Sequence, residues 1–211
     1  MGTLQVGGTT LGVKNRGTGK IDLSNVGDNS LPASAGASLV YLAKYTADSS
    51  VETTYFNLSS YTTFTTYKLI FENLLPDADD KILHIRVGTS TSALTSGYYS
   101  QQLTWKGPHS GLTDGHSTHT DVLFYLGSAI GIASGEHGVC GEAFITAPLS
   151  SSYFTCGSSG TIFAKEDGNH YRQFNSGYYT TAVSTPYIFL STSSGQDINS
   201  GNIILYGVRN A

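Results

Sequence analysis

Hydrophobic and polar residues alternate along most of the chain with a period of two, which is the spacing of a β-strand. The clearest case is segment 81–87, where three apolar side chains would share one face and His84 and Arg86 the other. No segment repeats its apolar residues at the 3.6-residue spacing of a helix. We therefore expect an all-β protein, an antiparallel β-sandwich of the jelly-roll-like kind. The expected strands are 39–43, 51–56, 67–74, 81–87, 98–105, 121–126, 139–146, 153–156, 161–165, 178–183, 187–190 and 202–208.

Residues 1–36 have a different texture from the rest of the chain. Short apolar islands alternate there with glycine, and together they offer too little apolar surface for a core. We expect an extended N-terminal anchoring arm and linker over 1–36, followed by a β-sandwich domain over 37–211. Such an arm would become ordered by pairing with sister chains or with another protein. The residues expected to make these assembly contacts are Leu4, Val6, Leu11, Val13, Ile21 and Leu23.

The last strand-like segment, 200–210, lies almost at the end of the sequence. A terminal strand frays unless neighbouring strands pair with it. We therefore expect this segment to be paired inside a sheet.

Composition narrows the range of functions. The chain has 211 residues, enough for one domain with a core, and only 12% of them are Asp, Glu, Lys or Arg, against roughly 25% in typical domains. The net charge is −4 and basic residues are not clustered, which argues against nucleic-acid binding as the main role. The sequence contains no long apolar stretch, and it lacks the basic and apolar regions of a signal peptide. We therefore expect that the protein is made in a cytoplasm and that it does not insert into a membrane.

Two cysteines, Cys140 and Cys156, are too few for a disulfide framework. They could face each other across a hairpin and pair, or they could fill the core as small thiols. No zinc-ligand spacing accompanies them.

Histidine and aspartate gather in the middle of the chain, where His116, His119 and Asp121 are weak candidates for a metal site. A His-x-x-His spacing on a loop fixes no coordination geometry. We expect a solvated loop there, and we predict no metal and no other cofactor.

Aromatic residues are the more informative group, because they combine a large apolar area with a polar end. The aromatics expected at a receptor or subunit interface are Tyr98, Tyr99, Trp105, Tyr178 and Tyr179.

Catalytic patterns are absent from the sequence. No Gly-x-Ser-x-Gly elbow occurs, and the carboxylates Glu136, Glu142 and Glu166 are scattered. We therefore predict no catalytic residues and a protein that is not an enzyme.

Several segments together resemble a known family. Residues 37–208 are similar to a large group of tailed-bacteriophage virion surface proteins, especially those of aquatic phages, which include tail-fibre, head-fibre and decoration-like proteins. The resemblance implies a β-sandwich on the outside of a virion, often oligomeric, and a homotrimer here. The His-rich segment 108–121 lies outside the family pattern. The segments that carry the resemblance are 1–6, 37–40, 51–60, 67–76 and 198–208.

From this resemblance we expect a non-enzymatic, fibre-type structural protein of a virion, made in the cytoplasm of a host bacterium. The arm would attach it to other virion proteins of the tail or capsid, and the sandwich would face a host or a neighbour. One alternative is a capsid decoration or cement protein that stabilises the head. A second alternative is a lectin-like module that binds a host surface glycan.

Overall fold

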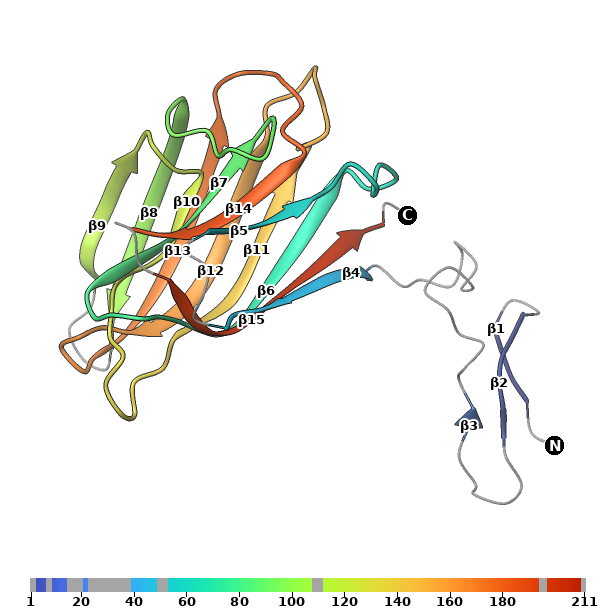
Figure 1. The fold of residues 1–211 in the computed structure, drawn as a ribbon, viewed down its shortest axis with the longest axis horizontal. Helices are drawn as coiled ribbons and strands as arrows, with labels where there is room; N and C mark the ends of the chain where they lie inside the picture. The colour runs from blue at the N-terminus through green and yellow to red at the C-terminus, as the bar shows by residue number, and fades with distance from the viewer. Residues whose placement is uncertain are drawn as a thin grey trace.

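The computed structural model describes residues 3–6, 9–14, 21–22, 39–48, 53–107, 112–193 and 197–209. These residues form strands and no helix, and each strand pairing is antiparallel (Figure 1). The all-β sandwich expected from the alternating pattern is confirmed. The strands are β1 (Thr3–Val6), β2 (Thr9–Lys14), β3 (Ile21–Asp22), β4 (Leu39–Thr46), β5 (Thr53–Asn57), β6 (Thr66–Pro76), β7 (Lys81–Gly88), β8 (Tyr98–Lys106), β9 (Leu112–His119), β10 (Phe124–Ile130), β11 (Val139–Thr146), β12 (Cys156–Ala164), β13 (His170–Tyr179), β14 (Tyr187–Thr192) and β15 (Ile198–Val208).

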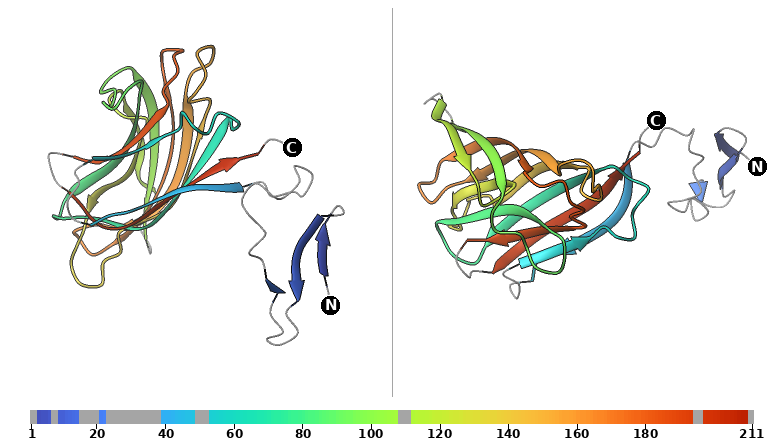
Figure 2. Two further views of the ribbon diagram at one scale, coloured as in Figure 1. Left: turned by 45° about the vertical axis from the view of Figure 1, so that its right-hand side comes forward. Right: turned by 90° about the horizontal axis from the view of Figure 1, so that it is seen from above.

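The sandwich has jelly-roll connectivity. A small sheet with the order β10-β7-β14-β5 lies across one face of a large sheet with the order β4-β15-β6-β11-β12-β13-β8-β9 (Figure 2). Without the hairpins β8–β9 and β12–β13, the chain crosses from one sheet to the other at every connection from β4 to β15 except β7–β10, whose two strands pair within the small sheet. The first and last of these strands are then neighbours, as in a jelly roll.

Alternating side chains from the two sheets fill the space between them. Leu83, Ile85 and Val87 of β7 point inward and are fully buried, as segment 81–87 predicts. Each buried side chain of this kind contributes about 1.5–3 kcal/mol relative to an exposed one. The largest fully buried residues of this core are Tyr67, Phe71, Phe124 and Phe163.

Strand β15 lies inside the large sheet, between β4 and β6, so the pairing expected for the last apolar segment is confirmed. Its register with β6 shifts near Gly201, whose φ is +106°. A Cβ at this position would lie 2.5 Å from the backbone oxygen of Asn73, which itself has a φ of 52°. Glycine therefore allows the two strands to approach each other at this irregularity.

Two hairpins extend the large sheet beyond the jelly roll, and they pair with each other through β13 and β8. Their inward face is mainly polar. Gln173 donates a hydrogen bond to the backbone oxygen of Tyr125 in β10 at 2.8 Å, and Thr161 donates one to that of Leu126 at 2.6 Å. The buried polar residues of this face are Ser100, Thr104, Ser159, Thr161, Gln173 and Asn175.

Two strand predictions are wrong, and the polar inward face explains the first of them. Strand β13 covers 170–179, whereas the sequence prediction began at Tyr178 and continued to 183, where the chain bends instead. Segment 153–156, also predicted as a strand, contains no strand residue before Cys156, where β12 begins. A strand whose inward residues are Gln and Asn lacks the apolar alternation by which a half-buried strand is recognised.

The expectation of a loop around the histidines is also wrong. Residues 112–119 form β9, which pairs with β8 at the edge of the large sheet. Pairing needs only backbone donors and acceptors, so a polar sequence can join a sheet once a neighbouring strand is in place.

The described N-terminal residues form a three-stranded sheet of their own. Strand β1 pairs with β2, and β2 pairs with β3, outside both sheets of the sandwich. Gly7 and Gly8 stand between the first two strands in the sequence, a composition that favours a two-residue hairpin turn. The expected contact residues Leu4 and Val6 lie in β1, Leu11 and Val13 in β2 and Ile21 in β3, and Leu23 lies outside the described residues.

Removal of residues 1–36 should leave the sandwich intact, because neither of its sheets takes a strand from this part of the chain. We expect the midpoint of thermal unfolding of the 37–211 fragment to match that of the full chain within about 2 °C, since a change of 1 kcal/mol in a domain of this size shifts it by roughly 2–4 °C. Differential scanning calorimetry checks this. A fragment that melts much earlier would show that the N-terminal strands stabilise the sandwich.

Candidate functional site

The outward side of the extended large sheet carries a set of apolar side chains, which we call the outer aromatic face. Ile162 is 53% exposed and Tyr99 42%, and the other members are exposed or half-buried. On these strands the usual order is reversed, with polar residues inside and apolar residues outside. The outer aromatic face comprises Tyr99, Trp105, Phe144, Phe154, Ile162, Phe174 and Tyr178.

Cross-strand pairing fixes the rings of this face in two groups. Tyr99 of β8 stands opposite Tyr178 of β13, with 5.7 Å between ring centroids, and Phe154 stacks on Tyr178 at 5.8 Å. Further along the same strands, Trp105 meets Phe174 edge to face at 5.3 Å. Aromatic pairs at such distances stabilise each other and are held in place by the sheet.

Two adjoining hollows lie at the Tyr178 end of this face. The larger, of about 860 Å³, is lined mainly by apolar side chains, among them Phe64, Leu149 and Tyr153. The smaller, of about 450 Å³, shares Cys156 and Tyr178 with it. An apolar, hollowed surface of this kind favours contact with another protein surface over contact with water.

The charged groups of the outer aromatic face have partners within the chain. Lys68 Nζ lies 2.6 Å from Glu142 Oε2 and 5.2 Å from the centre of the Phe144 ring. The guanidinium of Arg172 lies 4.6 Å from the centre of the Phe174 ring. The Lys68–Glu142 pair could therefore be covered without leaving an unpaired charge, which is the most unfavourable outcome of burying a polar surface.

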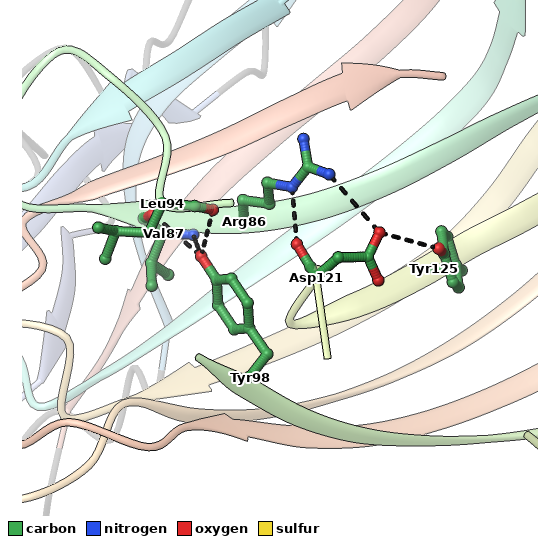
Figure 3. Close-up of polar contacts among 6 residues, drawn as sticks. All are labelled: Arg86, Val87, Leu94, Tyr98, Asp121 and Tyr125. Carbon is green, nitrogen blue, oxygen red and sulfur yellow. Dashed lines mark hydrogen bonds and ion pairs between the residues drawn. The ribbon is translucent and has the colours of Figure 1, made fainter. Parts of the chain in front are cut away.

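One predicted interface aromatic is wrong, because Tyr98 is only 2% exposed. Its hydroxyl accepts a hydrogen bond from Val87 N at 3.0 Å and lies 3.0 Å from the Leu94 backbone oxygen, to which it donates (Figure 3). Burial raises the pKa of the Tyr98 phenol to about 12, so the hydroxyl keeps its proton. Tyr179 is half-buried and packs on Tyr98, with 5.2 Å between ring centroids.

The two cysteines neither pair nor fill the core. Cys140 and Cys156 are free and exposed on the outward side of the large sheet. Cys140 stands opposite Ile162, six residues from Cys156 along β12, which corresponds to roughly 20 Å. Both interpretations of the sequence, a disulfide and a pair of core thiols, are therefore wrong.

A second, polar hollow of about 460 Å³ lies on the outward side of the small sheet. His84 and Arg86 of β7 line it, together with Asp121, Tyr125 and Ser191. His84 is 5% exposed, and burial, followed by the nearby Arg86, lowers its pKa to about 4. The alternation in segment 81–87 predicts the outward direction of His84 and Arg86, but not the residues that gather around them.

The structure gives no support to the metal candidates. Among the described side chains, no group of three His, Cys, Asp or Glu could hold an ion. The His119 ring packs edge to face on Tyr125, with 4.4 Å between centroids, and Asp121 faces Arg86. The backbone of His116 lies in β9, and its side chain is outside the described residues.

The scattered carboxylates serve separate local purposes. Glu136 accepts a hydrogen bond from Ala133 N at 2.7 Å within its own turn, and Glu142 pairs with Lys68. Glycoside hydrolysis needs two carboxyl groups facing one substrate bond.

The fold and its surfaces define a jelly-roll β-sandwich with one apolar and one polar candidate binding surface, on opposite sheets. No helix capable of spanning a membrane occurs in the described ranges. No protein family, curated protein or solved structure matches the chain.

Replacement of Tyr98 by Phe should lower the free energy of unfolding by about 1–3 kcal/mol, because Val87 N would be buried without an acceptor. Urea unfolding measures the change. The matched control is Tyr99→Phe, the exposed neighbour on the same strand, which should change stability by less than about 0.5 kcal/mol. Equal effects of the two variants would contradict the structural role of the Tyr98 hydroxyl.

The low pKa of His84 predicts a pH-dependent stability. An unfolded histidine titrates near pH 6.5, so between pH 6.5 and about 4 the unfolded chain binds more protons than the folded one. The contribution of His84 to the free energy of unfolding should therefore be fully present above pH 6.5, and about 3 kcal/mol of it should be lost as the pH drops through that window.

Chemical unfolding at several pH values, compared between the wild type and His84→Gln, isolates this contribution. The variant should lose that part of the pH dependence, whereas the control His137→Gln, at an exposed position, should retain it. An unchanged pH profile in His84→Gln would show that His84 does not remain neutral in the folded protein.

Proposed function

We propose that this chain is a non-enzymatic structural protein that self-associates through the outer aromatic face. The observation that carries the proposal is the reversed polarity of the inserted hairpins, which bury Gln173 and Asn175 while they expose Phe174 and Tyr178. An exposed apolar group on this scale is unusual for a protein that acts alone, and it is a common feature of interface cores.

A second copy of the chain is the occupant that fits this face best. Lys68 and Glu142 neutralise each other on the face, and Arg172, which lies over an aromatic ring, leaves a single positive charge, so the surface offers little attraction to a strongly charged partner. With 12% charged residues and a net charge of −4, two copies also repel each other little. Closed point-group symmetry, a two-fold or a three-fold among others, is the usual form of assembly for soluble homo-oligomers.

The particular role we propose is that of a fibre-type protein on the surface of a tailed-bacteriophage virion, present as a homotrimer. Support comes from the resemblance of residues 37–208 to such proteins, and from a jelly-roll fold, which occurs among virion proteins. The separate N-terminal sheet β1–β3 would attach the protein to the tail or capsid, and the sandwich would face outward. A capsid decoration protein, which would use the same surfaces, is the alternative.

Self-association should be visible in sedimentation equilibrium of the full chain at micromolar concentration, with a trimer as the expected species. Tyr99→Glu should weaken association by at least about tenfold, because it places an uncompensated charge inside an apolar contact. The matched control is Tyr55→Glu on β5 of the small sheet. Tyr55 is 46% exposed and meets Tyr187 at 5.6 Å, much as Tyr99 meets Tyr178.

A monomeric wild type, or equal weakening by both variants, would overturn the assembly proposal. Labelling of purified phage particles with an antibody against the sandwich tests the virion role separately. Labelled tails would support a fibre, labelled heads would support a decoration protein, and unlabelled particles would exclude both.

A further inference from the structure

The polar hollow on the outward side of the small sheet contains a buried group that lacks a partner. His84 is 5% exposed, and its Nε2 makes no hydrogen bond with the described residues. The residue lines the hollow and stands between Tyr125 of β10 and Ser191 of β14 in the sheet register. Buried polar atoms almost always have a partner, so an unpaired one beside a hollow points to a ligand.

The charged groups of the hollow balance one another. Arg86 Nε donates a hydrogen bond to the backbone oxygen of Asp121 at 2.8 Å, and its guanidinium lies 3.7 Å from the Asp121 carboxylate. The Tyr125 hydroxyl approaches the same carboxylate from the other side, at 3.4 Å (Figure 3). A single anion or cation entering the hollow would have to compete with this pair, whereas a neutral ligand could bind beside it.

Hydroxyl groups and a small apolar wall complete the lining. Ser191 accepts a hydrogen bond from Thr53 Oγ1 at 3.0 Å, and Ser193 accepts one from Ile82 N at 3.1 Å. Both serines, as hydroxyls, can also donate. Ala93, which is half-buried, supplies apolar contact. A ligand that matches this lining carries several groups that both donate and accept hydrogen bonds, on a compact and partly apolar frame.

We propose that this hollow binds one neutral pyranose unit of a glycan through sugar hydroxyls held by Asp121, Arg86 and His84. The volume of about 460 Å³ lies within the usual range of roughly 300–1,000 Å³ for small-ligand sites. A carboxylate and a guanidinium side by side accept and donate to adjacent hydroxyls. The site is on the sheet opposite the outer aromatic face, so binding does not depend on self-association.

Saturation-transfer NMR on the full chain tests the proposal, with the methyl glycosides of glucose, galactose, mannose and rhamnose as probes. At least one should receive magnetisation from the wild type. Asp121→Asn and His84→Phe should each weaken its binding by about tenfold or more, because the first replaces a charged acceptor oxygen by an amide nitrogen that cannot accept and the second removes the ring nitrogens.

The matched control is Glu142→Gln on the large sheet. Its carboxylate is 50% exposed and paired with a lysine, as that of Asp121 is 49% exposed and paired with an arginine, and its loss should leave glycoside binding unchanged. If His84→Phe unfolds, Asp121→Asn decides alone, because Asp121 is far more exposed.

Three outcomes would overturn the proposal. The wild type could bind none of the four glycosides, or the Asp121 and His84 variants could bind as tightly as Glu142→Gln. Binding of inorganic phosphate or of an N-acetylneuraminic acid glycoside, with no response to the neutral sugars, would show an anion site instead. Because the sugars are monomeric, none of these results depends on whether the chain forms a trimer.

Discussion

The backbone pairing between β13 and β8 is the interaction on which the surfaces of this protein depend. These strands belong to hairpins from distant parts of the chain, inserted into different connections of the jelly roll. Strand β12 pairs with β11, so the pairing of β13 with β8 adds the β8–β9 hairpin to the same continuous sheet, and β12, β13 and β8 all lie against β10. Without it the outer aromatic face would be divided, because Tyr99 and Trp105 lie on one hairpin and Tyr178 and Phe174 on the other.

The polar layer beneath that face is possible because its groups find partners in β10. Gln173 reaches the Tyr125 backbone oxygen, Thr161 reaches that of Leu126, and Asn175 donates to Ser159 at 3.0 Å. A buried amide left without a partner would destabilise the fold by about 1–3 kcal/mol. The layer therefore specifies how the hairpins sit on β10, while the apolar residues of the same strands are left for the outside.

The sequence was sufficient for elements whose burial follows from their own alternation. Segment 81–87 shows its inward and outward residues directly, and the last strand was recognisable by its apolar run. Strand β13 was not, because Gln173 is buried only through an acceptor on β10, which no local pattern reveals. Likewise Tyr98 and Tyr99 are chemically identical neighbours, and only the three-dimensional position of the Val87 amide separates a core residue from a surface one. The polar hollow could not be foreseen, since it joins strands distant in sequence.

The composition of an edge strand of the large sheet affects how copies of the chain can assemble into larger structures. Strand β9, at one edge, includes Asp114 and Gly115 and contains one apolar residue, Leu112. Edges of this composition are poor templates for the strand-to-strand addition that leads to fibrils. Strand β9 thus covers the edge of β8, the strand that carries Tyr99 and Trp105, and on this side of the sheet it disfavours the addition of further copies along the hydrogen-bonding direction.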